Sequence, residues 1–324
     1  MKHKRISPAL LAVLALAAAT AVTGTAASTA QAASYESSPV GYGAGTTGGG
    51  SATATTVSTL SAFTSAVSGD TAKVVKVSGL ISLSGQVDIG SNTTVIGVGS
   101  GSGLTGGGVR VKNESNVIIR NLVFSKPVGT DSITIQKSTY VWVDHNDLSS
   151  DRTHGKDYYD GLLDITHAAD YVSVSWNKFH DHYKVSLVGH SDSNASEDTG
   201  HLRVTYSHNW FYNVNSRLPS IRFGKAHILN NYFQNVGDSG IHSRMGAEVY
   251  VERNVFSGVP DAITTTGDSD VDGYANQLNN IYDSSSTTDI TQTSSYKPTY
   301  SYTPESNSTT AASVSAGAGT GKVG

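Results

Sequence analysis

The sequence contains no cysteine, so disulfide bonds contribute nothing to its fold. A chain of 324 residues can bury a large, regular core without such cross-links. The sequence also lacks an excess of basic residues, because 22 Lys and Arg stand against 26 Asp and Glu. This balance argues against a nucleic-acid-binding protein. Strong helix formers are sparse, whereas Gly, Ser, Thr, Asn and Val are plentiful, which indicates a β-rich chain with many turns.

The one long apolar run lies at the N-terminus. A basic head (Lys2–Arg5) precedes an apolar stretch at residues 8–22, and small residues follow as far as Ala30–Ala32. This pattern predicts a secretion signal over residues 1–32; the alternative, an uncleaved anchor helix, is disfavoured by the short run. Removal of its three basic residues changes the formal charge from −4 to −7. We expect a secreted, extracellular, soluble protein that binds neither nucleic acid nor membrane.

One eight-residue pattern, apolar-x-apolar-x-x-Asn-x-apolar, occurs six times between residues 116 and 256. Each copy predicts a short strand with alternating apolar positions, followed by a bend and a return to the core. Asparagine suits the bend because it tolerates the left-handed backbone conformation. The shared asparagines are Asn121, Asn146, Asn177, Asn209, Asn231 and Asn254, at spacings of 25, 31, 32, 22 and 23 residues.

A period of 22 or 23 residues, with insertions of up to about ten, matches one coil of a parallel β-helix with three short strands per coil. Stacked coils would align the asparagines into a ladder of side-chain amides, as in other stacked strands. The insertions would emerge as loops on the outer, binding face. The alternative, chance matches in a β-sandwich, does not account for the regular spacing. The sequence therefore predicts an all-β solenoid.

Helical periodicity appears once, over residues 56–68, where Leu60, Phe63 and Val67 recur after the candidate caps Ser58 and Thr59. A solenoid needs a covered end, so we expect a short N-terminal capping helix. The residues that follow the signal, 33–302, are predicted to form one parallel β-helix domain. Residues 303–324 are rich in Ser, Thr, Ala and Gly and are predicted to be a mobile tail.

Three aspartates between residues 141 and 224 are candidate metal ligands. The strand alternation of V-W-V-D puts Asp144 on the side opposite two valines, facing outward. Asp160 and Asp164 would lie about 13 Å apart in an extended strand, so they can share an ion only if the chain curls at Gly161. Carboxylate ligands without cysteine or a histidine pair favour Ca²⁺ over Zn²⁺.

Three cations, Lys184, Arg217 and Arg222, follow these aspartates. Any one of them alone is more simply a solvated surface charge. In R-x-P-x-x-R, however, Pro219 stiffens the segment between the two arginines. Two fixed guanidinium groups can each bind a carboxylate through two hydrogen bonds, so the segment indicates a site for an acidic ligand.

Together these motifs resemble the extracellular pectate lyases of polysaccharide lyase family 1. The resemblance runs in order from about Gly41 to about Asn280. The segments that carry it are V-W-V-D-H (Val141–His145), D-G-L-L-D (Asp160–Asp164), D-H-Y-K (Asp181–Lys184), L-V-G-H-S-D-S (Leu187–Ser193), V-T-Y-S-H-N (Val204–Asn209) and R-L-P-S-I-R-F-G (Arg217–Gly224).

The resemblance implies a right-handed parallel β-helix that cleaves polygalacturonate (pectate) by Ca²⁺-dependent β-elimination. It implies that Asp144, Asp160 and Asp164 bind the Ca²⁺. Arg217 would take the proton from C5 of a galacturonate unit, and Lys184 and Arg222 would bind substrate carboxylates and offset the developing charge. Some members of the family have a further acidic ligand where this chain has Trp142, a position that water or substrate must then fill.

Alternatives to this function remain on the same fold. Pectin lyase should lack the aspartate set, and a hydrolase (polygalacturonase) would use paired carboxylates without calcium. A non-catalytic glycan-binding β-helix would have no reason to keep Lys184 together with R-x-P-x-x-R. Arginine is an unusual base because it normally stays protonated, so the hypothesis for Arg217 predicts an alkaline optimum. A lone solenoid of this size is expected to be a monomer.

Overall fold

The computed structural model describes Met1 and residues 37–323. The predicted secretion signal therefore lies, apart from Met1, outside the described residues. None of the helices in the described part of the chain is long and apolar enough to cross a membrane.

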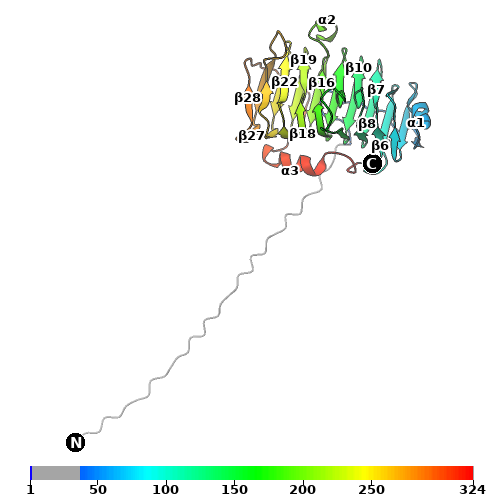
Figure 1. The fold of residues 1–324 in the computed structure, drawn as a ribbon, viewed down its shortest axis with the longest axis horizontal. Helices are drawn as coiled ribbons and strands as arrows, with labels where there is room; N and C mark the ends of the chain where they lie inside the picture. Colours follow the sequence, from blue (N-terminus) through cyan, green and yellow to red (C-terminus); the bar gives the residue numbers. More distant parts are fainter. Residues whose placement is uncertain (2–36, 324) are drawn as a thin grey trace. The chain divides into compact units, whose positions relative to one another are not determined.

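From residue 54 onward the chain winds into a parallel β-helix of three sheets (Figure 1), which confirms the predicted fold class. Each strand pairs in parallel with its counterpart in the next coil. Sheet 1 contains β1 (Ala54–Val57), β2 (Lys73–Val77), β5 (Thr93–Gly97), β8 (Ser115–Arg120), β11 (Thr139–Asp144), β14 (Asp170–Ser175), β17 (Arg203–Ser207), β20 (Lys225–Leu229), β23 (Glu248–Glu252) and β26 (Tyr274–Leu278). Sheet 2 contains β3 (Leu80–Ser82), β6 (Gly103–Thr105), β9 (Val123–Ser125), β12 (Asp147–Ser149), β15 (Lys178–Lys184), β18 (Trp210–Ser216), β21 (Tyr232–Val236), β24 (Val255–Ser257) and β27 (Ile281–Tyr282). Sheet 3 contains β4 (Gln86–Asp88), β7 (Gly108–Lys112), β10 (Ile133–Gln136), β13 (Leu163–Thr166), β16 (Leu187–Val188), β19 (Ser220–Arg222), β22 (Ser239–Arg244), β25 (Asp261–Thr264) and β28 (Thr287–Asp289).

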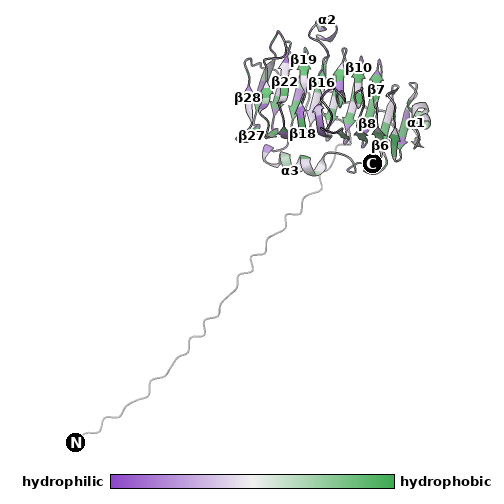
Figure 2. Cartoon of the chain, in the orientation of Figure 1, coloured by the Kyte–Doolittle hydropathy of each residue, from purple (hydrophilic) through white to green (hydrophobic). Residues whose placement is uncertain are grey.

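The core fills the inside of the three sheets. Hydrophobic and hydrophilic residues alternate along many strands (Figure 2), so apolar side chains enter the core and polar ones face out. In sheet 2 the inward aromatic rings stack from coil to coil. The centroids of Phe179, Phe211, Phe233 and Phe256 are separated in turn by 5.1, 4.8 and 4.6 Å.

The predicted asparagine ladder lies at the corner between sheets 1 and 2. The Nδ2 of Asn146 donates to Oδ1 of Asn177 at 2.9 Å, and Asn177 donates in the same way to Asn209 at 3.0 Å. Asn231 and Asn254 continue the series. These amides are fully buried, and each also accepts a backbone N–H, so the ladder satisfies polar groups that would otherwise be costly to bury.

The first predicted member, Asn121, does not belong to this ladder. Asp144 pairs with Arg120 in the strand register, which places Leu122 rather than Asn121 at the ladder position. The last rung is Asn280, whose Oδ1 accepts from Nδ2 of Asn254 at 3.1 Å. The sequence pattern missed it because Gln277 replaces the second apolar residue of that repeat.

The N-terminal capping helix is confirmed as α1 (Leu60–Val67), which packs on the first strands of the solenoid. Thr59 is the cap, and its side chain accepts a hydrogen bond from the backbone N–H of Ala62 at 3.3 Å. Phe63 and Val67 are completely buried, so the helix closes the end of the core. The helix is shorter than predicted because residues 54–57 form β1.

The C-terminal residues differ from the predicted mobile tail. Residues 307–317 form α3 (Asn307–Gly317), which lies against β21 and β24 and runs below the strands in Figure 1. Thr310 and Val314 are buried, and Thr310 Oγ1 accepts from Nδ2 of Asn230 at 2.8 Å. The small side chains that suggested disorder instead permit close packing against the backbone of the solenoid corner.

Segments from both ends of the described chain are fastened to sheet 1. The backbone N–H of Tyr42 donates to Thr205 Oγ1 at 3.0 Å, and Thr205 is hydrogen-bonded to the hydroxyl of Tyr300 at 2.8 Å. The Tyr300 hydroxyl also meets Nδ1 of His227 at 2.5 Å. The ring of His227 thus reaches Glu252 through its other nitrogen, Nε2, at 3.0 Å.

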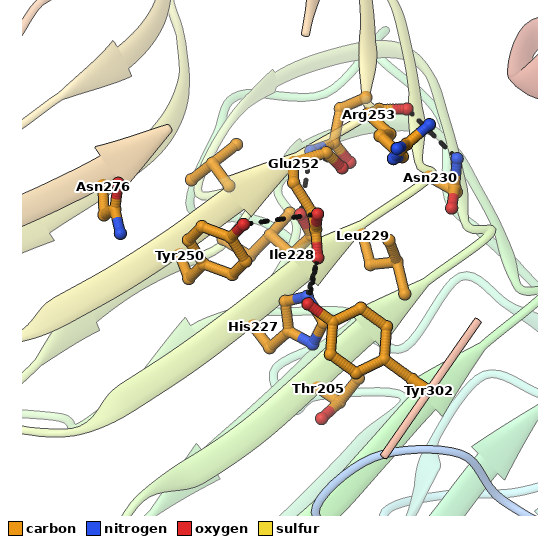
Figure 3. A network of polar contacts seen from close by, with 12 residues as sticks. Thr205, His227, Ile228, Leu229, Asn230, Tyr250, Glu252, Arg253, Asn276 and Tyr302 are labelled. Atoms are coloured by element: carbon orange, nitrogen blue, oxygen red, sulfur yellow. Dashed lines mark hydrogen bonds and ion pairs between the residues drawn. The ribbon is translucent and has the colours of Figure 1, made fainter. Parts of the chain in front are cut away.

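Glu252 lies at the centre of this network (Figure 3). Its carboxylate accepts hydrogen bonds from the hydroxyls of Tyr302 at 2.5 Å and Tyr250 at 3.4 Å, besides that of His227. Burial would raise the pKa of Glu252, but the contacts with His227 and Tyr302 outweigh it and hold the pKa below its usual value. We refer to these residues and Tyr300 as the tyrosine clamp.

Candidate active site

Two carboxylates converge at the edge of sheet 3. The N–H of Gly161 donates to Asp131 at 2.8 Å, and Thr134 Oγ1 donates to the same carboxylate at 2.7 Å. Asp164, on β13, accepts the N–H of Leu187 at 3.0 Å. A side chain added at Gly161 would meet oxygens of both Asp164 and Asp131, at 2.5 and 2.9 Å, so a larger residue there would displace both carboxylates.

The negative charges of these two carboxylates repel each other. Burial is the main cause that raises the pKa of both Asp131 and Asp164, and the negative charge of Asp131 raises that of Asp164 further. A cation placed between them would remove this repulsion. Asp131 and Asp164 are therefore suited to bind a hard cation.

Asp160 lies beside this pair, and its charge contributes to raising both pKa values. Its own carboxylate is exposed and faces Lys184, with Oδ1 3.4 Å from the lysine Nζ. Within residues 37–323 no three His, Cys, Asp or Glu side chains are already arranged around one metal position. Asp160 must turn from Lys184 toward Asp131 and Asp164 to complete a three-carboxylate site.

Asp144 is not part of this group, which corrects the prediction that it faces outward as a metal ligand. It lies on sheet 1 and is completely buried. Its carboxylate is 2.6 Å from Arg120 Nε and 2.7 Å from His145 Nδ1, and it accepts the hydroxyl of Ser175 at 2.6 Å. Arg120 and Ser175 are its register partners on the two neighbouring strands, so the stacking of coils itself neutralises Asp144.

Asp131 is the ligand candidate that sequence reasoning missed. The strand that follows it, β10, pairs with β13 so that Ile133 lies beside Leu163. Counting back two residues on both strands places Asp131 beside Gly161. The sequence feature that could have indicated Asp131 is the segment D-S-I-T-I at residues 131–135. It resembles D-G-L-L-D-I-T at residues 160–166, one coil later.

Next to these carboxylates is a cleft of about 270 Å³. Two of the three predicted cations, Lys184 and Arg217, line it. The charge of Arg217 lowers the pKa of both Asp131 and Asp164, which places it near that pair. Lys184, at the end of β15, is held by Asp157 at 3.0 Å as well as by Asp160. The other charged residues that line the cleft are Lys156, Asp238, Arg244 and Asp268.

The third predicted cation, Arg222, is not part of the cleft lining. It is almost buried, with Nε bound to the carboxylate of Asp192 and Nη1 donating to the carbonyl of Gly189 at 2.8 Å. Arg244, its register partner one coil later, does line the cleft. Burial and the charge of Arg222 lower the pKa of Arg244 to about 10. Sequence reasoning missed Arg244, although its spacing of 22 residues from Arg222 equals one coil.

Comparison with known proteins identifies the class of this fold and site. A family model described as pectate lyase matches residues 4–323. Pectate lyase A of Aspergillus niger is 52% identical over 262 residues, covering 80% of this chain and 79% of that protein. Pectate lyase B of Colletotrichum gloeosporioides is 51% identical over 292 residues, covering 89% and 87% of the two chains.

Among solved structures, a pectate lyase from Bacillus sp. N165 in complex with trigalacturonate superimposes with a TM-score of 0.80. It is 34% identical in sequence, and the match covers 88% of this chain and 100% of that one. The protein is accordingly an enzyme of the polysaccharide lyase class. Within that class the chain belongs to the pectate lyase family, as its motifs suggested.

Proposed function

We propose that this enzyme cleaves de-esterified α-1,4-polygalacturonate by Ca²⁺-dependent β-elimination and releases 4,5-unsaturated oligogalacturonides. The main support is that two mutually repelling carboxylates, Asp131 and Asp164, adjoin a cleft lined by Lys184, Arg217 and Arg244. An acidic polymer needs cations to bind its carboxylates directly, and a metal ion to join the others to the protein's own aspartates. The bound trigalacturonate in the Bacillus enzyme supports this substrate class.

Asp131, Asp164 and Asp160 are the proposed Ca²⁺ ligands, and Asp131 replaces Asp144 in the predicted set. Bound Ca²⁺ would link a substrate carboxylate to the protein and withdraw the negative charge that grows on it during proton removal. When Asp160 turns toward the metal, Lys184 loses one of its two carboxylate partners. A donor of Lys184 would then become available to a galacturonate carboxylate while Asp157 keeps its contact, so metal binding and substrate binding would support each other.

Arg217 is the proposed base. It removes the proton from C5 of a galacturonate unit, and the C5–H electrons form the C4–C5 double bond. The C4–O4 bond breaks with its electron pair going to O4, and the leaving sugar takes up a proton from solvent water at O4. Lys184 also stabilises the charge that develops on the substrate carboxylate.

This proposal is tested by the ultraviolet absorbance of unsaturated product from polygalacturonate, with Ca²⁺ and with excess chelator. We expect product only with calcium, and a loss of at least about 10³-fold in kcat for Arg217→Ala. Activity that survives chelation would point to pectin lyase chemistry. Reducing ends without unsaturated product would identify a hydrolase and contradict the role of Arg217.

Two further features are part of the proposal. The basic head and apolar run within residues 1–32 support secretion to the extracellular space. We also propose that the enzyme acts as a monomer, because the solenoid carries its own N-terminal cap in α1 and its own covering helix in α3.

A further inference from the structure

Apart from the backbone N–H of Leu187, which donates to Asp164, the motif L-V-G-H-S-D-S (Leu187–Ser193) has no role in the reaction described above. In sequence it lies between the carboxylates and Arg222. It begins with β16, directly beside β19, which carries Arg222. Two of its residues contact Arg222. The carbonyl of Gly189 accepts from Nη1 at 2.8 Å, and the carboxylate of Asp192 binds Nε.

Gly189 fits this contact closely. It has a φ of +80°, and a Cβ at this position would lie 3.1 Å from Cβ and 3.2 Å from the carbonyl oxygen of Arg222. Arg222 therefore packs directly on the turn, and two of its three side-chain nitrogens are engaged. The contacts of Arg222 within the described residues are made by its Nε and Nη1.

The loop that carries Asp192 is anchored at its far end. After the motif, α2 (Ala195–Asp198) places the buried carboxylate of Asp198 2.7 Å from the backbone N–H of Ala168, which donates to it. Glu197 pairs with Lys137 at 3.0 Å, and the ring of His190 stacks on His167 with centroids 4.0 Å apart. A loop fastened in this way can hold a charge in one place.

Arg222 and Arg244 stand side by side on adjacent strands, and their positive charges repel each other. The carboxylate of Asp192 is close to both of them. Asp268, the carboxylate nearest Arg244, is far more exposed and lies 3.9 Å from Nη1. Asp192 is thus the less exposed of the two carboxylates beside this arginine pair.

We propose that Asp192 is a positioning residue for Arg222 and for its neighbour Arg244, which lines the cleft. It fixes the orientation of Arg222 and offsets its charge, so that Arg222 and Arg244 can lie side by side where an acidic polysaccharide binds. This inference rests on the proposed function. In this proposal the Leu187–Ser193 motif fixes the side chain of Arg222 through the contacts of Gly189 and Asp192.

The test compares Asp192→Asn with Asp270→Asn, which removes the same charge from an exposed position on a neighbouring loop. KM and kcat are measured on polygalacturonate at fixed calcium. We expect Asp192→Asn to raise KM about tenfold, the size of one lost charge-assisted contact, with kcat changed less than about twofold. The control is expected to match the wild type. Equal KM values for the two variants would overturn the proposal.

A double-mutant cycle with Arg222→Ala separates positioning from general damage to the fold. If Asp192 acts through Arg222, its substitution has no further effect on KM once Arg222 is alanine; additive losses would contradict this. Asp192→Glu keeps the carboxylate, so it should bind substrate better than Asp192→Asn, and a Glu variant that does not also overturns the proposal. A wild type that forms no unsaturated product would count against the proposed function itself. An active wild type and an Asp192→Asn variant with the same KM would count against this inference alone.

Discussion

The carboxylates of Asp144 and Asp164 can be compared directly, because both lie on strands of the same solenoid and both were expected to bind calcium. Asp144 is surrounded by Arg120, His145 and Ser175, which supply opposite charge and hydrogen bonds. Asp164 receives one backbone N–H and faces Asp131, another carboxylate. The first arrangement stabilises the fold, whereas the second stores repulsion that a cation can relieve. The partners of the two carboxylates therefore distinguish the structural aspartate, Asp144, from the proposed metal ligand, Asp164.

The largest effects are expected for Asp164→Asn, which should lose activity, and for Asp144→Asn, which should lose stability. Asp164→Asn should lower calcium-dependent activity by at least about 10²-fold without lowering the unfolding temperature measured in chelator, because it removes like-charge repulsion. Asp144→Asn should instead destabilise the protein by about 3–5 kcal/mol, because Arg120, whose side chain is only 17% exposed, loses its carboxylate. Activity assays at low temperature and thermal melts with and without calcium measure both effects.

The change in unfolding temperature on adding calcium provides a second comparison of the same two variants. Added calcium should raise the unfolding temperature of the wild type and of Asp144→Asn, since a ligand bound only by the folded state stabilises it. It should not raise that of Asp164→Asn. If the calcium response were lost in Asp144→Asn and kept in Asp164→Asn, the assignment of the two carboxylates would be reversed.

A smaller effect concerns Glu252, another buried carboxylate, which like Asp144 has several hydrogen-bond partners. Burial lowers the pKa of His227, and the contacts of Glu252 hold its pKa low as well. Both groups therefore bind protons more weakly in the folded than in the unfolded state. Stability is complete above the usual histidine pKa of about 6.5 and falls as the pH drops, first through His227 and then, below about 4.5, through Glu252.

For His227 alone the slope should reach at most about 1.4 kcal/mol per pH unit. Denaturant titrations between pH 7.5 and 5 measure it, and His227→Asn should flatten the dependence in that range. The matched control is Tyr212→Phe, an aromatic change outside the tyrosine clamp. An unchanged slope in His227→Asn would show that other groups titrate.

The smallest expected effect concerns the exposed contact between Asp157 and Lys184. The Asp157 carboxylate occupies a donor of Lys184 that the substrate carboxylate is proposed to use. Asp157→Asn should therefore lower KM by about two- to threefold and leave kcat unchanged, because exposed ion pairs are weak. A higher KM would mean that Asp157 assists binding. Steady-state kinetics at low and high salt decide between the two, since the effect should shrink as salt screens the pair.

The regular part of the fold could be predicted because it repeats. Five of the six expected asparagines form the ladder, and the strand pattern that carries them extends over most of the solenoid. Asn121 was misplaced because its repeat matches the pattern when shifted by one residue. Only the pairing of Asp144 with Arg120 reveals the shift.

The candidate site could be predicted only in part, for the same reason. Sequence alone places an aspartate at a strand end but does not say which residue of the next coil lies beside it. Asp144 and Asp131 look equivalent until the register shows Arg120 beside one and Gly161 beside the other. Arg217 could be proposed because the stiff segment R-x-P-x-x-R is recognisable in the sequence itself, and Lys184 because it ends the segment D-H-Y-K.

The C-terminal segment has a consequence for how the molecule comes apart. Asn307 donates to the carbonyl of Asn279 near the last coils, whereas the backbone N–H of Gly321 donates to Asn121, in a coil 200 residues earlier in the chain. In a simple solenoid each coil contacts only its neighbours, so the ends can fray one coil at a time. Here one C-terminal segment, from Asn307 to Gly321, is hydrogen-bonded to coils far apart along the solenoid. Distant coils therefore cannot unfold independently until this segment detaches.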